Sequence, residues 1–543
     1  MNATEISSER TAPRGNHRIL YVSDPSSIAR NFLPDPVREE DLRRWVDMVA
    51  DSGVDLFDQE VFSQGWTTYW QSERYEYDRR LQHRRFLPLL EAGTQPLDIL
   101  IDQAHRREMK FIAGFRVNDN HAHQSREQGV GIAEFIESRP DLQLKELPEG
   151  EYYEMSEPLD FSFEEVREFT LGVVREVVAR FDIDGVELCF RDHAYFPRDR
   201  GLELASLMTD LVQQIRAVLD ERGAAIGGKL VLGARVYSTI EECAFLGLDV
   251  PTWISDGLID YISPQDVMYA DFSVPYDAWA ALARDSDCLL YPGLQPWSSF
   301  RARYRRNGSP LSPASVRALA QTMYGAGADG IAIYNHFVAN LWYAPFYPQA
   351  MQIFHQLRDP ARIARGERHY IFDPTWAGMT GFGGEAKCST GTVKANQILL
   401  DPSHDRGEYR FYLFEDLQNV RSATLFFRGF GLSQDDELEV RLNGHLVPAA
   451  AIGRTGQSDA LPGDRGHVRE EGERIVPCIP ERGRVDCRED SGPAFSTRWF
   501  SLSATMVAYG ENCLSIALLQ RDPQAEEDIV IDELEVWVEP WWE

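Results

Sequence analysis

One short run combines residue types suited to acid–base chemistry with the pattern of a strand. It is the run 181–197, FDIDGVELCFRDHAYFP, where apolar side chains at every second position would face a layer between strand and helix. Gly185, Glu187, Cys189 and Arg191 must then point the other way, toward the inside of a sheet or barrel. A buried carboxylate is costly unless it is hydrogen-bonded, paired or used in catalysis. The run therefore predicts Glu187 as the central functional residue.

Polar and aromatic residues also follow the other expected strands and an aromatic loop. Glycoside chemistry uses such a mixture, because carboxyl groups flank the glycosidic bond while amides, guanidinium groups and aromatic faces hold the sugar ring. We therefore predict a carbohydrate substrate. We expect it to be bound by Arg116, Asn118, His121, His123, Arg191, Asp192, Arg235, Tyr237, Trp66, Trp70, Gln295, Trp297, Tyr334 and Asn335.

Hydrolysis of a glycosidic bond needs a proton donor and a second carboxyl group that acts as base or nucleophile. Glu187 is the predicted general acid, and its partner is expected among Asp58, Glu60 and Asp266. In the alternative interpretation, Glu187 is a structural acid paired with an arginine across the barrel. Asp266 has the alternative role of a helix cap.

His121 and His123 are spaced two residues apart in an expected loop. A third ligand would have to lie nearby for a metal site, and none stands beside them in the sequence. Sugar contact is therefore the favoured role for this pair. We expect neither a metal nor a cofactor.

The elements that must position these residues alternate between strand and helix. Strands are expected at 18–23, 54–62, 110–118, 184–190, 230–237, 258–263, 288–294 and 330–335, with helices at 36–52, 96–107, 163–180, 202–222 and 313–324 between them. Eight alternating units predict an α/β fold, a (β/α)8 TIM barrel over residues 17–360 with its functional groups at the carboxyl ends of the strands. A doubly wound open sheet is the alternative, but no glycine-rich phosphate loop follows an early strand.

The sequence pattern changes after the barrel. A Gly-rich connection is expected at 361–394, and residues 395–543 contain short alternating strands that predict an all-β, jelly-roll-like sandwich. Asn443-Gly444 lies between two apolar runs and predicts a hairpin turn, because both residues tolerate positive φ. We expect this region to support the barrel, with glycan binding as the alternative.

Charge and composition limit the classes of partner. The net charge is −31, and five of the 55 basic residues are Lys. Such a surface repels nucleic acid and anionic membranes, so neither is an expected partner. Residues 1–16 are expected to be disordered and contain no apolar run typical of a signal peptide, and the seven scattered cysteines fit reduced thiols. The expected location is cytoplasmic; the oligomeric state is left open.

Four stretches resemble a known family. They are FRVNDNHAH from Phe115, the segment from LDFSFEEVREF to FRDHAYF, RVYSTIEECAFLGLDVPTWISDGLIDYISP from Arg235, and GADGIAIYNHF. Together they resemble bacterial glycosyl hydrolase-like TIM-barrel proteins that often carry a C-terminal β-sandwich. The central motif of that family, D-G-[IV]-E-L-D-[FW]-x-R, is matched at Asp184, Gly185 and Glu187 but not at Cys189, where the family has an acid.

The resemblance implies a glycoside hydrolase acting on an oligo- or polysaccharide. Cys189 in place of the family acid leaves two further interpretations open. One is a carbohydrate-binding protein without turnover, and the other is a lyase for uronic-acid sugars. In the lyase, Arg116 or Arg235 would neutralise the carboxylate of the sugar while a Tyr or His takes the proton.

Overall fold

The computed structural model describes most of the chain. The described residues are 13–62, 64–118, 122–145, 157–190, 194–197, 199–265, 270–295, 311–334, 336, 351–372, 398–401, 403–454, 468–471, 474–477, 496–526 and 528–541.

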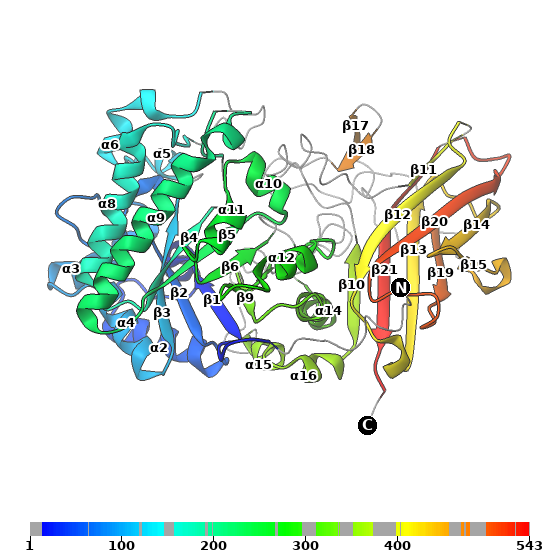
Figure 1. Cartoon of the computed structure of the whole chain (residues 1–543), viewed down its shortest axis with the longest axis horizontal. Helices are drawn as coiled ribbons and strands as arrows, with labels where there is room; N and C mark the ends of the chain where they lie inside the picture. Colours follow the sequence, from blue (N-terminus) through cyan, green and yellow to red (C-terminus); the bar gives the residue numbers. More distant parts are fainter. Residues whose placement is uncertain are drawn as a thin grey trace.

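Parallel strands form the first half of the molecule (Figure 1). They are β1 (Ile19–Ser23), β2 (Leu56–Phe62), β3 (Lys110–Arg116), β4 (Gly185–Cys189), β5 (Val231–Val236), β6 (Tyr261–Pro264), β7 (Leu289–Leu290), β8 (Gly293–Leu294) and β9 (Ile331–Ile333). Their order is β7-β6-β5-β4-β3-β2-β1-β9-β8. β7 pairs with β6, whereas β8, two residues further along the chain, pairs with β9. These two pieces therefore serve as one strand that closes the sheet, and the predicted (β/α)8 barrel is confirmed.

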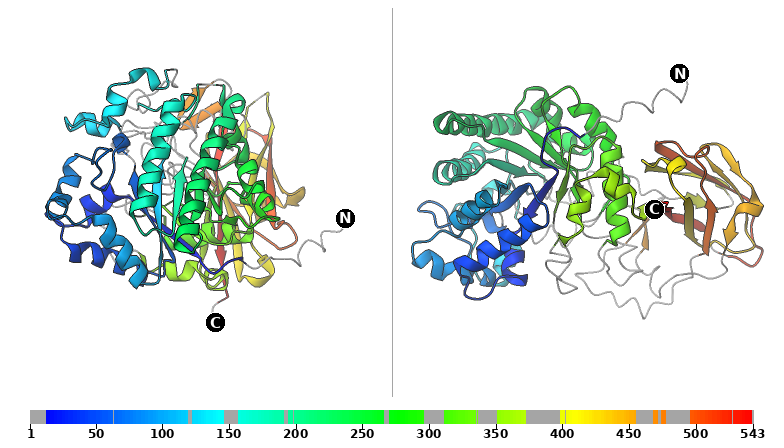
Figure 2. Two further views of the ribbon diagram at one scale, coloured as in Figure 1. Left: turned by 60° about the vertical axis from the view of Figure 1, so that its left-hand side comes forward. Right: turned by 90° about the horizontal axis from the view of Figure 1, so that it is seen from below.

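Helices follow the strands and surround the barrel (Figures 1 and 2). The longer ones are α2 (Glu39–Asp51), α4 (Pro96–Arg106), α8 (Glu164–Arg180), α9 (Gly201–Ile226), α12 (Tyr276–Ala283) and α14 (Pro313–Gly325). Five of them lie where the sequence predicted helices. The short α1 (Pro25–Asn31), α10 (Ile240–Phe245) and α11 (Val250–Ser255) were not predicted, because a helix of two turns carries little hydrophobic periodicity.

The second half of the molecule is built from antiparallel sheets. One sheet has the order β10 (Arg368–Phe372), β21 (Ile529–Glu539), β13 (Ser422–Phe430), β19 (Ser496–Ser501) and β16 (Gly453–Arg454), and β11 (Ile398–Leu400) also pairs with β21. The other has the order β12 (Arg406–Leu413), β20 (Gly510–Gln520), β14 (Glu437–Leu442) and β15 (His445–Val447). The all-β prediction is confirmed. β10 lies within the residues expected to form the connection.

The predicted hairpin turn is present between β14 and β15. Leu442 pairs with His445 across a loop of two residues. Asn443 and Gly444 in that loop have φ of 50° and 81°. Two central residues with positive φ match the twist of the flanking strands, which explains why Asn-Gly was a usable signal.

The sandwich packs against the barrel along α14, next to β10 (Figure 1). Gln321 on α14 donates to the carbonyl oxygen of Phe414 at 3.0 Å, and the Tyr509 hydroxyl donates to the carbonyl oxygen of Gly325 at 3.1 Å. The ring centroids of Phe414 and Tyr509 lie 5.4 Å apart, edge to face. Gly325 allows this approach, because a β-carbon there would collide with Phe414.

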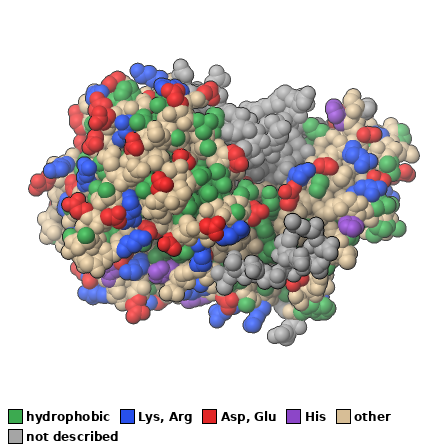
Figure 3. All heavy atoms as spheres, in the orientation of Figure 1, with side chains coloured by type: hydrophobic (Ala, Val, Ile, Leu, Met, Phe, Trp, Pro, Cys, Tyr) green, Lys and Arg blue, Asp and Glu red, His purple; other side chains and the backbone are tan. Residues whose placement is uncertain are grey.

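Acidic and basic side chains intermingle on the face shown in Figure 3. None of the helices in the described ranges has the length and apolar character needed to cross a membrane. The described cysteines, which include Cys189, Cys243 and Cys288, form no disulfide among themselves.

Candidate active site

The inside of the barrel has an apolar part and an ionisable part, which share Tyr261 and Tyr334. Leu20, Val22, Leu56, Tyr261, Tyr291, Ala332 and Tyr334 form an apolar cluster separate from the main core. Toward the carboxyl ends of the strands, the register aligns Glu60 with Gly114, Gly114 with Glu187, and Glu187 with Gly233. Acidic side chains on even-numbered strands therefore alternate with glycines on odd-numbered strands.

The glycines give the large polar side chains room inside the barrel. A β-carbon at Gly114 would collide with the Asp58 carboxyl group, and one at Gly233 with the ring of Tyr261. A β-carbon at Gly293 on β8 would collide with the Gln265 amide. Without these glycines the interior could not hold its ionisable groups at the present spacing.

One half of the ionisable cluster is centred on Glu187. Its Oε1 accepts a hydrogen bond of 2.7 Å from Arg235 Nε, and its Oε2 accepts one of 3.0 Å from the Tyr261 hydroxyl. Arg235 Nη2 also lies 3.5 Å from Asp58 Oδ2. The guanidinium carbon of Arg235 stands 4.6 Å from the centroid of the Tyr334 ring, within range of a cation–π interaction. Glu187 and Asp58 are each 1% exposed and Arg235 is 0% exposed.

The other half is centred on Glu60. Arg116 Nε donates to Glu60 Oε1 at 3.1 Å, and Arg116 Nη2 donates to the Tyr334 hydroxyl at 2.6 Å. The same hydroxyl donates to Glu60 Oε1 at 3.5 Å. Tyr334 thus joins the two halves, since its ring faces Arg235 and its hydroxyl faces Arg116 and Glu60.

Burial perturbs two of the three carboxyl groups strongly. Burial, with a further contribution from the neighbouring Glu187 carboxylate, raises the pKa of Asp58 well above its usual value. Burial also raises the pKa of Glu60, to about 7, although the positive charge of Arg116 opposes that shift. Near neutral pH Glu60 is therefore poised between its two protonation states, and burial favours the neutral form of Asp58.

Several buried polar atoms of the cluster have no hydrogen-bond partner among the described residues. They are both carboxyl oxygens of Asp58, Oε2 of Glu60, Nη1 of Arg235, Oγ of Ser263, and the amide oxygen and nitrogen of Gln265. A buried polar atom without a partner costs roughly 1–3 kcal/mol, so a concentration of such atoms in one place needs an explanation. A ligand rich in hydroxyl groups is one chemical class that satisfies both donors and acceptors.

Residues 27–214 match the model of a family described as Glycosyl hydrolase-like 10. This part of the chain carries Asp58, Glu60, Arg116 and Glu187. The barrel resembles a glycosyl hydrolase. The resemblance inferred from the sequence motifs is therefore confirmed.

The curated relatives support the same resemblance. The Glycosyl hydrolase DigH of Escherichia coli (strain K12) is 24% identical over 252 residues, which cover 37% of this chain and 54% of the relative. DigH of Shigella flexneri matches with the same figures. The chain spans about half of the length of these relatives.

Solved structures of glycoside hydrolases are similar at low TM-scores. The glycoside hydrolase domain of PgaB (BpsB) from Bordetella bronchiseptica has a TM-score of 0.40 and 14% identity, covering 64% of this chain and 99% of that one. An α-amylase from Geobacillus thermoleovorans has a TM-score of 0.39 and 14% identity, covering 93% and 99%. The fold of this chain is given by its own strand order.

The structure brings together six of the residues expected at the site. Asp58, Glu60, Arg116, Glu187, Arg235 and Tyr334 form the cluster, and Gln295 is a buried residue that directly follows β8. Expected residues outside the described part of the chain are His121, Arg191, Asp192, Asp266, Trp297 and Asn335, together with the side chain of His123.

Other expected residues lie away from the cluster. Asn118 braces a loop, because its amide donates to the carbonyl oxygens of Leu159 and Ala194 at 3.0 and 2.9 Å. Tyr237, Trp66 and Trp70 are buried in the main hydrophobic core.

The loop tryptophans are part of the packing between barrel elements. Trp70 donates to Glu176 on α8 at 2.9 Å, and its ring packs edge-on to Phe181, with centroids 6.2 Å apart. The expectation that the two tryptophans stack on substrate therefore remains a prediction without a contact to support it.

Tyr261 is a member of the cluster that the sequence interpretation did not include. It occupies the first of the alternating positions Tyr261, Ser263 and Gln265 on and after β6, and that alternation is the signal that could have identified it. Burial and the negative charge of Glu187 raise the pKa of its hydroxyl well above the usual value, so Tyr261 acts as a hydrogen-bond donor.

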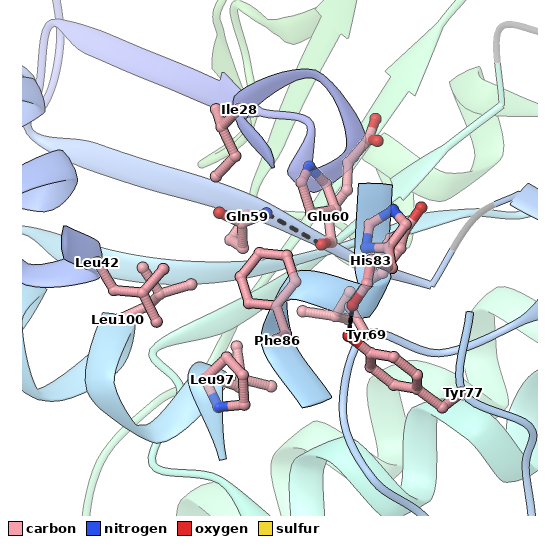
Figure 4. Close-up of a pocket in the computed structure, with 13 residues that line it drawn as sticks. Ile28, Leu42, Gln59, Glu60, Tyr69, Tyr77, His83, Phe86, Leu97 and Leu100 are labelled. Carbon is pink, nitrogen blue, oxygen red and sulfur yellow. Dashed lines mark hydrogen bonds between the residues drawn. The ribbon is translucent and has the colours of Figure 1, made fainter. Parts of the chain in front are cut away.

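A small cavity lies beside β2, and Glu60 is one of the residues that line it (Figure 4). Its volume is about 30 Å³, and its walls are mainly apolar side chains such as Ile28, Leu42, Phe86 and Leu100. Gln59, which precedes Glu60 on the strand, lines it and donates to the Glu60 carbonyl oxygen at 3.2 Å. Space of this size holds about one water molecule, so the cavity is too small for a sugar. Among the described residues, no group of three His, Cys, Asp or Glu is placed to hold a metal ion.

Proposed function

We propose that the chain hydrolyses glycosidic bonds of an oligo- or polysaccharide at the carboxyl end of the barrel strands. The observation that carries this proposal is the buried cluster of Asp58, Glu60 and Glu187 with Arg116 and Arg235, located where TIM-barrel enzymes carry their active sites. The match to a glycosyl hydrolase-like family supports the choice of substrate class. We further propose that residues 17–360 carry the reaction and residues 395–543 support the barrel.

Glu60 is the better candidate for the proton donor. A general acid at neutral pH needs a pKa near 7, and burial raises the pKa of Glu60 to about 7. Its Oε2 has no hydrogen-bond partner among the described residues, which leaves it available to a leaving-group oxygen. Glycosidases raise the pKa of their acid by the same physical means.

Glu187 is suited to a different role. Both of its oxygens accept hydrogen bonds from Arg235 and Tyr261, which fixes the orientation of the carboxylate. A fixed negative charge stabilises the positive charge that develops on the sugar ring in an oxocarbenium-like transition state. Asp58, whose pKa is raised well above the usual value, would then add less negative charge beside Glu187 than a free carboxyl group does.

A hydrolysis screen tests the proposal. Purified wild type, Glu60→Gln and Glu187→Gln are assayed in parallel on chromogenic glycosides and on plant and microbial oligosaccharides. We expect reducing sugar from the wild type, and a loss of about 100-fold or more in each variant, because general acids and fixed charges contribute factors of that size. A wild type that releases nothing from any member of the panel would sink the hydrolase proposal.

Binding without turnover is the second candidate. The near-complete burial of Glu187 and Arg235 and their mutual pairing are also what a structural ion pair would show. In that case oligosaccharides would raise the melting temperature of the wild type and of Glu187→Gln equally, with no product from either protein.

A further inference from the structure

Cys189 holds the inward-facing position of β4 two residues beyond Glu187 toward the carboxyl end. The parallel register aligns its Cα with that of Arg116 on β3 and with that of Arg235 on β5. The side chain is 6% exposed, and it interacts electrostatically with the Arg235 guanidinium group. The thiol therefore stands in the cluster between two strand positions that carry positive charge.

The carboxyl groups around these two arginines carry less negative charge than their number suggests. Burial raises the pKa of Asp58 well above its usual value and that of Glu60 to about 7. The raised pKa values favour the neutral forms of these two carboxyl groups, which leaves less negative charge beside the two guanidinium groups. Neighbouring guanidinium groups favour the thiolate form of a cysteine, and the thiolate is the nucleophile.

Buried polar atoms on β5, on β6 and just after β6 point to a ligand inside the barrel, and the strand register puts Arg235 and Ser263 in the same layer as Cys189. Arg235 is 0% exposed, and its Nη1 has no hydrogen-bond partner among the described residues. Ser263 and Gln265, both 0% exposed on the inward side of β6 and just after it, also have side-chain polar atoms without a partner there. A ligand that satisfied these atoms would lie within the ring of strands that includes β4.

We propose that Cys189 is the nucleophile of the barrel site and attacks the anomeric carbon of the bound sugar. This inference rests on the proposed hydrolase function and adds a covalent intermediate to it. A sulfur–carbon bond replaces the glycosidic carbon–oxygen bond, so the reaction takes place in two displacements.

Cys189, Glu60 and water account for every proton and electron pair in the two displacements. In the first, the thiolate electron pair forms the bond to the anomeric carbon. The carbon–oxygen pair leaves with the glycosidic oxygen, which takes the proton of Glu60. In the second, water attacks the same carbon, the Glu60 carboxylate takes its proton, and the sulfur–carbon pair returns to Cys189 as thiolate. Two inversions retain the anomeric configuration.

Alkylation tests the thiol directly, without a substrate. The native full-length chain is treated with iodoacetamide at pH 7, and each cysteine is followed by peptide mass spectrometry. Cys243 and Cys288 are the controls, because burial raises the pKa of both thiols, that of Cys288 to about 12. We expect Cys189 to react at least about tenfold faster than either control, because reactive thiols lie in electropositive surroundings. Equal or slower alkylation of Cys189 overturns the proposal.

Kinetic assays of Cys189 variants distinguish the nucleophile proposal from the hydrolase proposal. Cys189→Ala and Cys189→Ser are assayed on the glycoside that the wild type hydrolyses, with Cys243→Ala as the matched control. We expect kcat/KM to fall about 100-fold or more in both Cys189 variants, with the control within about twofold. Full activity of Cys189→Ala overturns the nucleophile proposal but not the hydrolase proposal. An inactive wild type overturns both proposals.

A trapping experiment guards against variants that fail to fold. The wild type is incubated with the 2,4-dinitrophenyl 2-deoxy-2-fluoro derivative of the hydrolysed sugar, and its peptides are mapped by mass spectrometry. The expected result is a fluoroglycosyl adduct on the peptide that contains Cys189. An adduct on Glu60, Glu187 or Asp58 instead overturns the assignment.

Discussion

At the scale of single residues, three carboxyl groups of the same chemistry have different environments. Glu187 is held by two hydrogen-bond donors, Glu60 is held at one oxygen, and neither oxygen of Asp58 has a hydrogen-bond donor among the described residues. Burial raises the pKa of Glu60 to about 7, which suits a group that gives and takes a proton near neutral pH. The contacts of Glu187 instead fix the orientation of its carboxyl group.

The pH dependence of the proposed hydrolysis follows from Glu60. A proton donor whose pKa is raised to about 7 is active below that pH, so kcat/KM of the wild type should fall as pH rises through about 7. Because the positive charge of Arg116 lowers this pKa, Arg116→Gln should move the alkaline limb to higher pH. pH–rate profiles of the wild type and of Arg116→Gln measure the alkaline limb and its shift. An alkaline limb that stays in place in the variant would argue against Glu60 as the donor.

The buried pair of Glu187 and Arg235 makes a prediction about stability. Arg235→Met leaves Glu187 buried without its cation and should cost about 3–5 kcal/mol in the free energy of unfolding. The double variant Arg235→Met with Glu187→Gln should lose less than the single variant, since no uncompensated charge remains. Urea denaturation measures the free energy of unfolding of the wild type, the single variant and the double variant.

An exposed pair provides the control for that experiment. Arg410 and Glu511 form an ion pair between side chains that are 64% and 48% exposed. Arg410→Met should cost less than about 1 kcal/mol, because solvent screens such pairs. Equal losses for Arg235→Met and Arg410→Met would contradict the view that burial makes the first pair critical.

At the scale of elements, the site depends on glycines in strands. Strand glycines normally weaken a sheet, and here they allow Asp58, Tyr261 and Gln265 to enter the barrel from neighbouring strands. The alternation of a large polar residue on one strand with glycine on the next gives the interior its polar layer. A single methyl group is enough to disturb it.

Gly233→Ala should destabilise the barrel by about 1–3 kcal/mol or more, because the added β-carbon collides with the ring of Tyr261. Gly228→Ala is the matched control, since no atom lies within 4 Å of the β-carbon it would add. Thermal unfolding gives the melting temperatures of both variants, which are then compared. Equal melting temperatures would show that Tyr261 can move aside without cost, and that its hydrogen bond to Glu187 is dispensable.

At the scale of the whole molecule, the barrel and the sandwich share the surface between α14 and β10. Phe414, just after β12, contacts Gly325 at the end of α14 and packs edge-on to Tyr509. A buried aromatic residue at such a boundary links the unfolding of the two parts. This arrangement fits the expected supporting role of the sandwich.

Phe414→Ala should therefore lower the stability of both parts. The loss of a buried phenyl ring costs about 3–5 kcal/mol, and it should split the calorimetric unfolding into two transitions. Leu519→Ala is the control, because Leu519 is 64% exposed. A single unchanged transition in Phe414→Ala would show that the two parts are not coupled through this contact.

The sequence by itself determined the barrel, the sandwich and the inward position of Glu187. Those features are local: alternation marks a strand, periodicity marks a long helix, and Asn443-Gly444 marks a turn, each within about ten residues. Only the tertiary structure decided which carboxyl groups meet which arginines. The partners of Glu187 come from 48 and 74 residues away in the chain, and Arg116 meets Tyr334 across 218 residues. Such pairings depend on the closure and register of the whole barrel, which no local pattern encodes.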